Sequence, residues 1–247
     1  MSDQIKVKVR NMTKKFGDLL VLNDVSFDVR KGEFLCIVGP TGCGKTTFLN
    51  CITKLYEPTS GEILVNNEPV NLKKHNVAYI FQEYSTMPWL SVEQNVAFGL
   101  EIKGVDKKTI EKEVSEVLEI VGLTDYRNYY PVELSTSMIQ RVVIARAFAT
   151  KPELLLMDEP YGQLDVELRF KLEDELLKLW RKTGTTVLFI THNIEEAVYL
   201  SENILVLTNK PTTIKKRLEN PLPFPRKVAD PAFLEVRNEV TDLIKWW

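Results

Sequence analysis

The sequence predicts an α/β fold with a mostly parallel sheet, an N-terminal antiparallel β subdomain and an inserted α-helical subdomain. Residues 39–46 read Gly-Pro-Thr-Gly-Cys-Gly-Lys-Thr, the phosphate-binding pattern of glycine, any four residues, glycine, lysine and threonine. After residue 150, short apolar segments alternate with helical patterns, which is typical of a parallel sheet. Between about 91 and 150 the patterns are helical and strand signals are few.

The phosphate-binding pattern lies in the right local context. The apolar run at 33–38 is typical of a buried strand, and residues 47–52 can start a helix. Glycines let backbone amides curl around an anion, and the helix start adds free amides and a positive dipole end. Lys45 is expected to reach the outer phosphates, and the Thr46 hydroxyl to bind Mg²⁺. The alternative is a glycine-rich turn followed by an incidental lysine, which this context disfavours.

The first eighty residues are dominated by strand patterns. Polar and apolar residues alternate at 5–9 and again at 25–29, as in half-buried strands. A further strand at 62–65 is followed by Asn66-Asn67, which indicates a hairpin turn, and another short strand is predicted at 77–81. This region therefore combines an antiparallel sheet with the phosphate-binding strand and helix.

Helix boundaries follow from capping residues and glycines. Asp106 is expected to cap a helix whose apolar side recurs at helical spacing as far as Val121, with Gly122 as its stop. Ser135 is expected to cap another helix that runs through 141–147. The remaining predicted elements are strands at 154–157, 186–190 and 204–207, and helices at 166–182 (ended by Gly184), 194–200 and from Pro231 through Trp246-Trp247.

Composition excludes several classes of protein. With 44% apolar and 27% charged residues, the 247-residue chain is typical of a globular protein, and a net charge of −2 disfavours nucleic acid as the main partner. The three cysteines lie in apolar or motif contexts, which predicts reduced thiols rather than disulfides. We find neither a secretion signal nor a membrane-spanning apolar stretch, so a membrane role would need another chain. The basic run at 215–217 is expected to be a solvated edge.

Two carboxylates follow the apolar run at 154–157. Acids at the C-terminal end of a buried strand stand where α/β folds place ligand chemistry. Asp158 is expected to hold the Mg²⁺ shell and Glu159 to polarise the attacking water. The alternative is an acidic turn after a strand, which the accompanying phosphate loop disfavours.

Three further polar residues are candidates with weaker signals. His192, just after the strand at 186–190, could donate a hydrogen bond to a terminal phosphate or simply cap the next helix. Gln82, at the end of a strand, could touch metal or the attacking water. His75 lies between Lys74 and Asn76 in a polar stretch and is expected on the surface.

Together these motifs resemble the ATPase subunit of an ATP-binding cassette (ABC) transporter, over about residues 5–210. The motifs that match, in order, are the phosphate loop at 39–46, Gln82 as the Q-loop, Leu134-Ser135 as the start of the signature, Asp158 and Glu159 as the Walker B pair, Gly162-Gln163-Leu164-Asp165 as the D-loop, and His192 as the switch histidine. The resemblance implies a P-loop NTPase core, with ATP and Mg²⁺ as cofactors.

The resemblance also assigns the site residues. It implies catalytic roles for Glu159, His192, Lys45 and Gln82, and Mg²⁺ contacts for Thr46, Gln82 and Asp158. Phe16 stands where the family has an aromatic residue stacked on adenine, although it could also be an ordinary core residue. The nucleotide-binding residues implied are Phe16, Gly39, Pro40, Thr41, Gly42, Cys43, Gly44, Lys45, Thr46, Thr47 and Ser135.

Two stretches resemble the nitrate, sulfonate and taurine importers: Gln82-Glu83 with Met87–Val92, and 220–226 followed by 230–233. The resemblance implies one cassette domain over 1–247, with an ATPase core at 1–84 and 151–215, a helical signature subdomain at 85–150 and a C-terminal extension at 216–247. It implies a transmembrane permease partner, a second ATPase subunit that is identical or different, an indirectly acting solute-binding protein and no nucleic acid. The expected location is the cytoplasmic face of the membrane, with Met87–Val92 in a groove for a helix of the permease.

The signature departs from the family pattern. The family has Leu-Ser-Gly-Gly where this chain has Leu134-Ser135-Thr136-Ser137. In the family these glycine amides approach the γ-phosphate held by the opposite subunit, so side chains are expected to crowd the contact. The altered signature leaves four possibilities open: an asymmetric pair of different subunits, a slow homodimer, a sequence altered to block hydrolysis, or activity retained through Ser135.

Two other functions compete with ATP-driven import. One is a regulatory subunit that binds ATP with little turnover. The other is a cassette ATPase of DNA repair or translation, which the single cassette and near-neutral charge disfavour.

Overall fold

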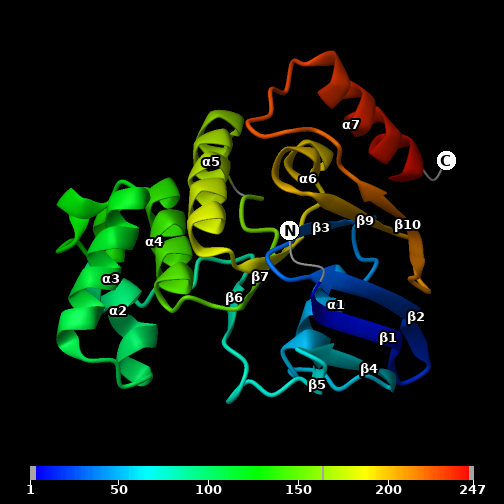
Figure 1. Ribbon diagram of the computed structural model, residues 1–247, viewed down its shortest axis with the longest axis horizontal. Coiled ribbons are helices and arrows are strands. Elements are labelled where there is room, and N and C mark those ends of the chain that lie inside the picture. The colour runs from blue at the N-terminus through cyan, green and yellow to red at the C-terminus, as the bar shows by residue number, and fades with distance from the viewer. Residues whose placement is uncertain (1–3, 163, 245–247) are drawn as a thin grey trace. The chain divides into compact units, whose positions relative to one another are not determined.

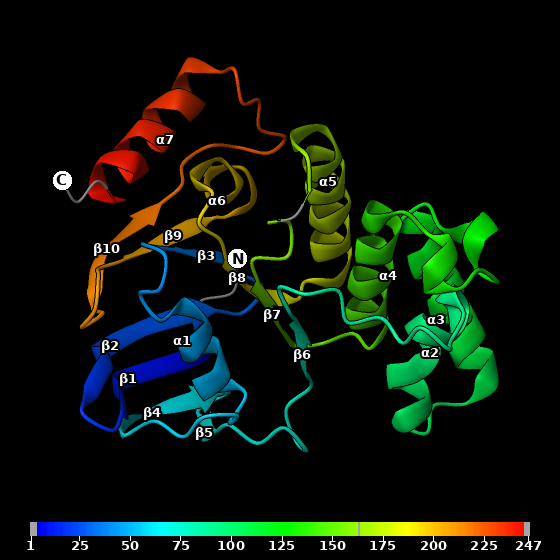
Figure 2. The same cartoon turned by 180° about the vertical axis from the view of Figure 1, so that it is seen from behind.

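The computed structural model describes residues 4–162 and 164–244, which form two compact units (Figures 1 and 2). The first unit is built from residues up to 75 and from 186 onward, and the second from residues 76–185. Gln163 of the predicted D-loop and Trp246-Trp247 of the predicted last helix lie outside the described residues. Among the helices of the described chain, none is both long and apolar enough to cross a membrane.

An antiparallel sheet of strand order β2-β1-β4-β5 forms one part of the first unit. Its strands are β1 (Ile5–Phe16), β2 (Leu19–Arg30), β4 (Ser60–Val65) and β5 (Glu68–Pro69). The predicted antiparallel subdomain is thus confirmed, and β1 runs further than predicted because register shifts carry its pairing past Val9. Asn66 and Asn67 both have positive φ, 54° and 63°, as the predicted two-residue hairpin turn requires.

The strands β10-β9-β3-β8 form the other sheet portion of the first unit. The bounds are β3 (Phe34–Val38), β8 (Thr186–Ile190), β9 (Asn203–Leu207) and β10 (Ile214–Glu219), with helices α1 (Lys45–Ile52), α6 (Ile194–Leu200) and α7 (Pro231–Ile244). Strand β3 pairs parallel with β8 and β9, and both β3 and β8 are buried along their whole length. This confirms the predicted parallel core.

Strand β10 was not predicted from the sequence. It pairs antiparallel with β9, and only Leu218 in it is buried, so its sequence lacks the alternation that marks a half-buried strand. Residues 215–217 are exposed on it, which confirms the predicted solvated edge. Charged side chains on an edge strand also discourage pairing with other chains.

The second unit combines a parallel strand pair with helices. Its elements are β6 (Val77–Ile80), β7 (Leu154–Asp158), α2 (Val92–Ile102), α3 (Lys107–Ile120), η1 (Thr124–Tyr126), η2 (Pro131–Glu133), α4 (Thr136–Ala149) and α5 (Val166–Thr183). The predicted caps are confirmed: Asp106 accepts from the Thr109 amide at 3.0 Å, and Ser135 from the Met138 amide at 3.4 Å. Gly122 and Gly184 end α3 and α5 with φ of 65° and 64°.

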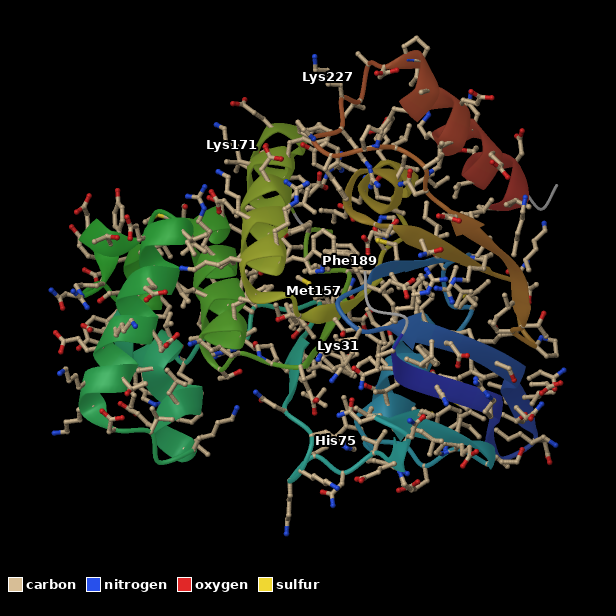
Figure 3. All side chains as sticks on the ribbon, viewed as in Figure 1. Lys31, His75, Met157, Lys171, Phe189 and Lys227 are labelled. Atoms are coloured by element: carbon tan, nitrogen blue, oxygen red, sulfur yellow. The ribbon has the colours of Figure 1, made fainter. Side chains whose placement is uncertain are left out.

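His75 corrects one expectation, because it is buried rather than on the surface (Figure 3). Only 3% of its surface is exposed. The Lys74 and His75 amides both donate to the Asn71 carbonyl, at 3.0 and 2.7 Å, and the Asn71 amide donates to His75 Nδ1 at 3.2 Å. This closed turn folds the imidazole inward, which the polar neighbours in sequence do not reveal.

All three cysteines are buried and none is in a disulfide, as predicted. Burial raises the pKa of Cys51 to about 11, and it also raises the pKa of the Cys43 thiol. A high pKa keeps the thiol protonated near neutral pH, so these groups act as small apolar core residues.

Phe189 is a core residue of the first unit and offers a test of its packing (Figure 3). Its ring lies 5.9 Å from the Phe34 ring, centroid to centroid, on the paired strands β8 and β3. We predict that Phe189→Ala lowers the free energy of unfolding by about 3–5 kcal/mol, because it leaves a cavity in a closely packed core. Urea denaturation followed by circular dichroism measures this loss. Leu55→Ala, at an exposed position of the same unit, should shift it by less than about 0.5 kcal/mol.

Candidate functional site

The phosphate loop of the first unit connects β3 to α1. Gly42 and Gly44 have φ of +76° and +110°, a region that L side chains rarely adopt. A Cβ on Gly44 would also lie 2.7 Å from Val21 Cγ1, well inside contact distance. Both glycines are therefore needed for the loop to curl between strand and helix, with the free amides of α1 at its end.

Lys45 holds its cation within this loop. Its side chain is buried, and Nζ donates to the carbonyls of Gly39 at 3.0 Å and Pro40 at 3.2 Å. Thr46, the next residue, is exposed in the first turn of α1. The Lys45 ammonium thus lies inside the loop, next to the exposed Thr46.

The connection between β9 and β10 contacts the phosphate loop and fixes its backbone. Thr212 is fully buried, and its hydroxyl donates to the Cys43 carbonyl. A Cβ on Gly39 would lie 3.0 Å from Leu207 Cβ, so β9 also packs directly against the loop. Thr212 is not marked by any local sequence signal, because its partner is 169 residues away.

Phe16 is exposed at the end of β1 and is not a core residue. Its ring is 41% exposed and meets Tyr56 edge-on, with centroids 5.3 Å apart. Lys14 Nζ lies 4.8 Å from the centroid of the Phe16 ring. The alternative interpretation of Phe16 as core is therefore wrong, and an exposed ring suits stacking on a planar base. Tyr56, its neighbour, had no sequence signal.

His192 lies at the same end of the sheet as the phosphate loop. The parallel register pairs Ile37 with Ile190, and the Thr191 amide donates to the Ile37 carbonyl at 3.3 Å. The side chain of His192 is exposed there. It does not cap α6: Asn193 Oδ1 accepts from the amides of Glu195 and Glu196, at 2.9 and 3.3 Å.

In the second unit, the parallel pair β6 and β7 carries the predicted acids and glutamine. Ile80 is in register with Met157, so Gln82 and Glu159 leave the pair at the same end. Asp158 is buried as the last residue of β7, and the Tyr79 hydroxyl donates to its Oδ2 at 3.3 Å. Burial, together with the Asp158 charge, raises the pKa of Tyr79 and keeps it a donor.

Glu159 has a positive φ of 45°, which is uncommon for a residue with a side chain. Such strain concentrates at functional positions, because the surrounding structure must hold it. The two carboxylates thus differ: Asp158 is buried at the strand end, whereas Glu159 begins the following turn in a strained conformation.

The signature region forms the start of α4. Ser135 is the exposed cap, and Thr136 after it is exposed as well. Ser137 is buried, and its Oγ lies 3.2 Å from Ser135 Oγ. Further along α4, Arg141 donates from Nε and Nη2 to the Glu175 carboxylate at 2.9 and 2.8 Å, which ties α4 to α5. In the described part of the D-loop, Asp165 caps α5 by accepting from the Leu168 amide at 3.0 Å.

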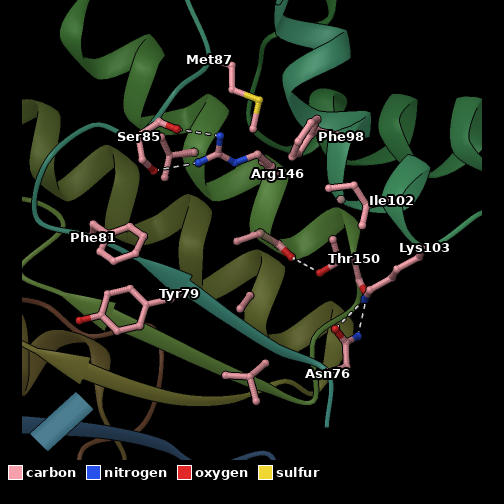
Figure 4. A pocket seen from close by; sticks show the side chains of 15 residues that line it. Asn76, Tyr79, Phe81, Ser85, Met87, Phe98, Ile102, Lys103, Arg146 and Thr150 are labelled. Carbon is pink, nitrogen blue, oxygen red and sulfur yellow. Dashed lines mark hydrogen bonds between the residues drawn. The ribbon is translucent and has the colours of Figure 1, made fainter. Parts of the chain in front are cut away.

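A groove of about 500 Å³ lies within the second unit (Figure 4). Apolar side chains dominate its lining: Tyr79, Phe81, Met87, Phe98, Ile102 and Val143. Arg146 lies in it and donates to the Ser85 carbonyl and hydroxyl, both at 2.8 Å, and burial lowers the pKa of its guanidinium. Within Met87–Val92, the stretch predicted to form a groove for the permease, Met87 lines this groove. Trp89, two residues further along the chain, is 72% exposed.

Comparison with known proteins gives consistent matches. The family model described as ABC transporter matches residues 22–162. An uncharacterized ABC transporter ATP-binding protein of Methanocaldococcus jannaschii is 41% identical over 246 residues, 98% of this chain and 92% of that protein. An aliphatic sulfonates import ATP-binding protein of Bacillus cereus is 40% identical over 240 residues, 97% of this chain and 94% of that protein. A dimeric ATP-binding cassette solved with ADP and Pi has a TM-score of 0.75 and 31% identity, covering 88% of this chain and 100% of that chain.

The geometry of Gly44 generates a direct test of the phosphate loop. We predict that Gly44→Ala weakens binding of a nucleoside triphosphate at least about tenfold, or ~1.4 kcal/mol, because the methyl group collides with Val21. Isothermal titration calorimetry measures the affinity. Gly104→Ala is the matched control, since Gly104 also has positive φ (69°) but open space around its Cβ position. Equal affinity of the Gly44 variant and the wild type would contradict the assigned loop.

Proposed function

Because the chain belongs to the ABC transporter family, we propose that it is the ATP-hydrolysing subunit of a membrane importer for a small solute. The observation that carries the proposal is the curled loop between β3 and α1 that encloses the Lys45 ammonium. The relative from Bacillus cereus is an aliphatic sulfonates import protein, which supports a solute of the nitrate, sulfonate or taurine class. The chain would act at the cytoplasmic face of the membrane, as a single cassette domain over 1–247.

Nucleotide binding is assigned to the phosphate loop and its surroundings. Residues Gly39–Thr47 would surround the phosphates and donate backbone N–H groups, except for Pro40, which has none, and Lys45 would contact the outer phosphates. The exposed Phe16 ring would stack on adenine. For Mg²⁺ we assign Thr46, Gln82 and Asp158, whose oxygen atoms suit this hard cation. Mg²⁺ needs few ligands from the protein, because phosphate oxygens and water fill its other coordination positions. When bound, the cation neutralises phosphate charge.

Hydrolysis is assigned to four side chains. Glu159 would act as the general base that polarises the attacking water, and Gln82 would orient this water. His192 would donate a hydrogen bond to the terminal phosphate, and Lys45 would stabilise the charge that develops there. Each residue stands where parallel strands end: His192 and the phosphate loop at one end of β3 and β8, and Gln82 and Glu159 at one end of β6 and β7.

The working assembly would contain two ATPase subunits. Two nucleotides would be sandwiched between the subunits, with Ser135 and the first amides of α4 facing the nucleotide of the other subunit. Closure of the pair would drive the permease, and hydrolysis would reset it. The dimeric cassette solved with ADP and Pi, 31% identical to this chain, supports this arrangement. A solute-binding protein would act only indirectly, and no nucleic acid is involved.

A second candidate is a regulatory subunit that binds ATP but hydrolyses little. The specific observation in its favour lies at the signature, where Thr136 and Ser137 carry side chains. Ser137 Oγ lies 3.2 Å from Ser135 Oγ, so the hydroxyl that should face a phosphate already has a neighbour within hydrogen-bonding distance. The retained Glu159 and His192 favour hydrolysis instead.

Steady-state ATPase activity with Mg²⁺ separates these two functions. We predict that the purified chain hydrolyses ATP and that Glu159→Gln lowers kcat by at least about 10²-fold, because the general base is lost. ATP affinity measured by calorimetry should stay within about twofold for this variant, since Glu159 acts on the water rather than on binding.

The Thr136→Gly/Ser137→Gly double variant completes this experiment. Activity near background in the wild type that is recovered in the double variant would favour the regulatory subunit, with the signature as the lesion. Activity already present in the wild type, lost in Glu159→Gln and little changed by the glycines, would confirm a working ATPase.

The groove of the second unit is our candidate docking site for the permease. Its walls are apolar, with Phe98 and Ile102 from α2 and Met87 from the preceding loop (Figure 4). An apolar groove of this kind accepts one face of an amphipathic helix. Arg146 and Lys103 add positive charge to its lining. Together these features fit a cytoplasmic helix of a membrane partner that presents apolar side chains.

Trp89 tests the docking site. We predict that Trp89→Ala leaves ATP affinity unchanged and weakens association with the permease, because Trp89 is exposed, follows the groove-lining Met87 by two residues, and is of the residue type that supplies much of the binding energy at interfaces. Co-purification of the permease with the tagged chain, followed by quantification, measures the association. Val132→Ala, at a position that is 88% exposed and does not line the groove, is the control. Unchanged association in the Trp89 variant would refute the assignment.

A further inference from the structure

The C-terminal extension holds the end of α6, the helix that begins two residues after His192. The guanidinium of Arg226 donates from Nη1 to the carbonyls of Val198, Tyr199 and Ser201, at 2.7, 3.0 and 2.7 Å. Asn220 Nδ2 donates to the carbonyls of Val198 and Ser201, at 2.8 and 3.0 Å. Two side chains of the extension therefore bind the free carbonyls that every helix leaves at its C-terminus.

Both side chains are buried, with 7% of each residue exposed. The rest of the Arg226 guanidinium donates to the Leu222 carbonyl, from Nε at 3.2 Å and Nη2 at 3.0 Å, and its carbon lies 3.9 Å from the centre of the Phe224 ring. A buried cation at a helix C-terminus is stabilised by the helix dipole and by these charge-assisted hydrogen bonds. The contact is thus a specific clamp and not a passing surface pair.

The other end of α6 is fixed as well. The Thr191 hydroxyl donates to the Glu196 carboxylate at 2.5 Å, and Asn193 caps the first amides. From α7, Arg237 Nη1 donates to Glu195 at 3.3 Å. A seven-residue helix has little stability of its own, so these tertiary contacts decide where it lies.

We propose that Arg226 and Asn220 are positioning residues for His192, through the clamp they form on α6. This inference rests on the proposed function, because it assigns His192 to the terminal phosphate of ATP. Without Arg226, the carbonyls of Val198, Tyr199 and Ser201 at the end of α6 each lose a donor, and Asn220 reaches only Val198 and Ser201, so the end of the helix shifts or frays. Since a single residue, Asn193, separates His192 from α6 in the sequence, a shift of the helix moves the imidazole relative to the phosphate loop. A displacement of about 1 Å is enough to impair a reacting group.

Hydrogen–deuterium exchange tests the clamp without reference to activity. In Arg226→Gln, amides of 194–200 should exchange faster than in the wild type, while amides of α1 and β3 keep their rates. Asn220→Ala is the second variant, should Arg226→Gln fail to fold, and it should show the same local change. Lys216→Gln is the matched control: it removes a cation from the same extension, but Lys216 pairs with Glu239, 2.8 Å away and exposed, and not with α6.

Steady-state kinetics tests the effect on His192. Arg226→Gln should lower kcat about tenfold while KM for ATP changes by less than about twofold, because the phosphate loop is untouched. Arg226→Lys keeps the charge but not the fork of donors, so its kcat should be intermediate. In a His192→Ala background, Arg226→Gln should lower kcat no further, because both changes act through one group.

The outcomes separate the clamp from the proposed function. A wild-type chain without ATPase activity would contradict the proposed function, and this inference with it. An active wild type with unchanged kcat and unchanged exchange of 194–200 in Arg226→Gln would overturn the clamp alone. So would an equal loss of kcat in the wild-type and His192→Ala backgrounds, since that indicates a general structural role.

Discussion

The conformation of the phosphate loop is the constraint on which the first unit depends. Gly44 approaches Val21 too closely for any side chain, and its backbone dihedrals exclude most other residues. The loop can keep this shape only if both of its ends are rigid, and it begins at β3, which is paired on both sides and fully buried. The Thr212 hydroxyl then fixes the middle of the loop from the β9–β10 connection. Preorganised amides are what make such a loop bind phosphate well.

The polar contacts of the C-terminal extension contribute unequally to its stability. The pair of Lys216 and Glu239 is about half exposed on both sides, and pairs of this kind contribute ~0–1 kcal/mol. Arg226 is buried among carbonyls, and its loss would remove a hydrogen-bond donor from several of them at once. The buried contacts of Arg226 and Asn220 therefore hold the extension to α6 more strongly than an exposed ion pair of this kind could.

The signature region begins α4 with an ordinary helix cap, but its next two side chains differ from the family pattern. Ser135 caps α4 as helix starts require, and Arg141 anchors the helix through a two-pronged contact with Glu175. The helix and its free amides are thus intact. Thr136 and Ser137 stand where the family pattern has glycines, and their side chains add bulk where close approach of a phosphate is expected. The departure therefore concerns chemistry at the helix start and leaves the fold unaffected.

Features of this protein that arise within a few residues could be predicted from the sequence alone. The loop at 39–46, the caps Asp106 and Ser135, and the Asn66-Asn67 turn each depend on contacts between near neighbours, so their residue types suffice. The parallel core was predictable too, because buried strands read as short apolar runs.

Only the tertiary structure decided the features whose partners are distant in sequence. His75 is buried through a turn that brings its imidazole inward, and β10 is a strand because β9 pairs with it. Thr212 meets Cys43 across 169 residues, and Arg226 meets Val198 across 28. The sequence around a polar side chain does not indicate to which distant carbonyl that side chain will donate a hydrogen bond. The conformation of the loop was therefore predictable from the sequence, whereas the contacts that hold the loop and α6 in place were not.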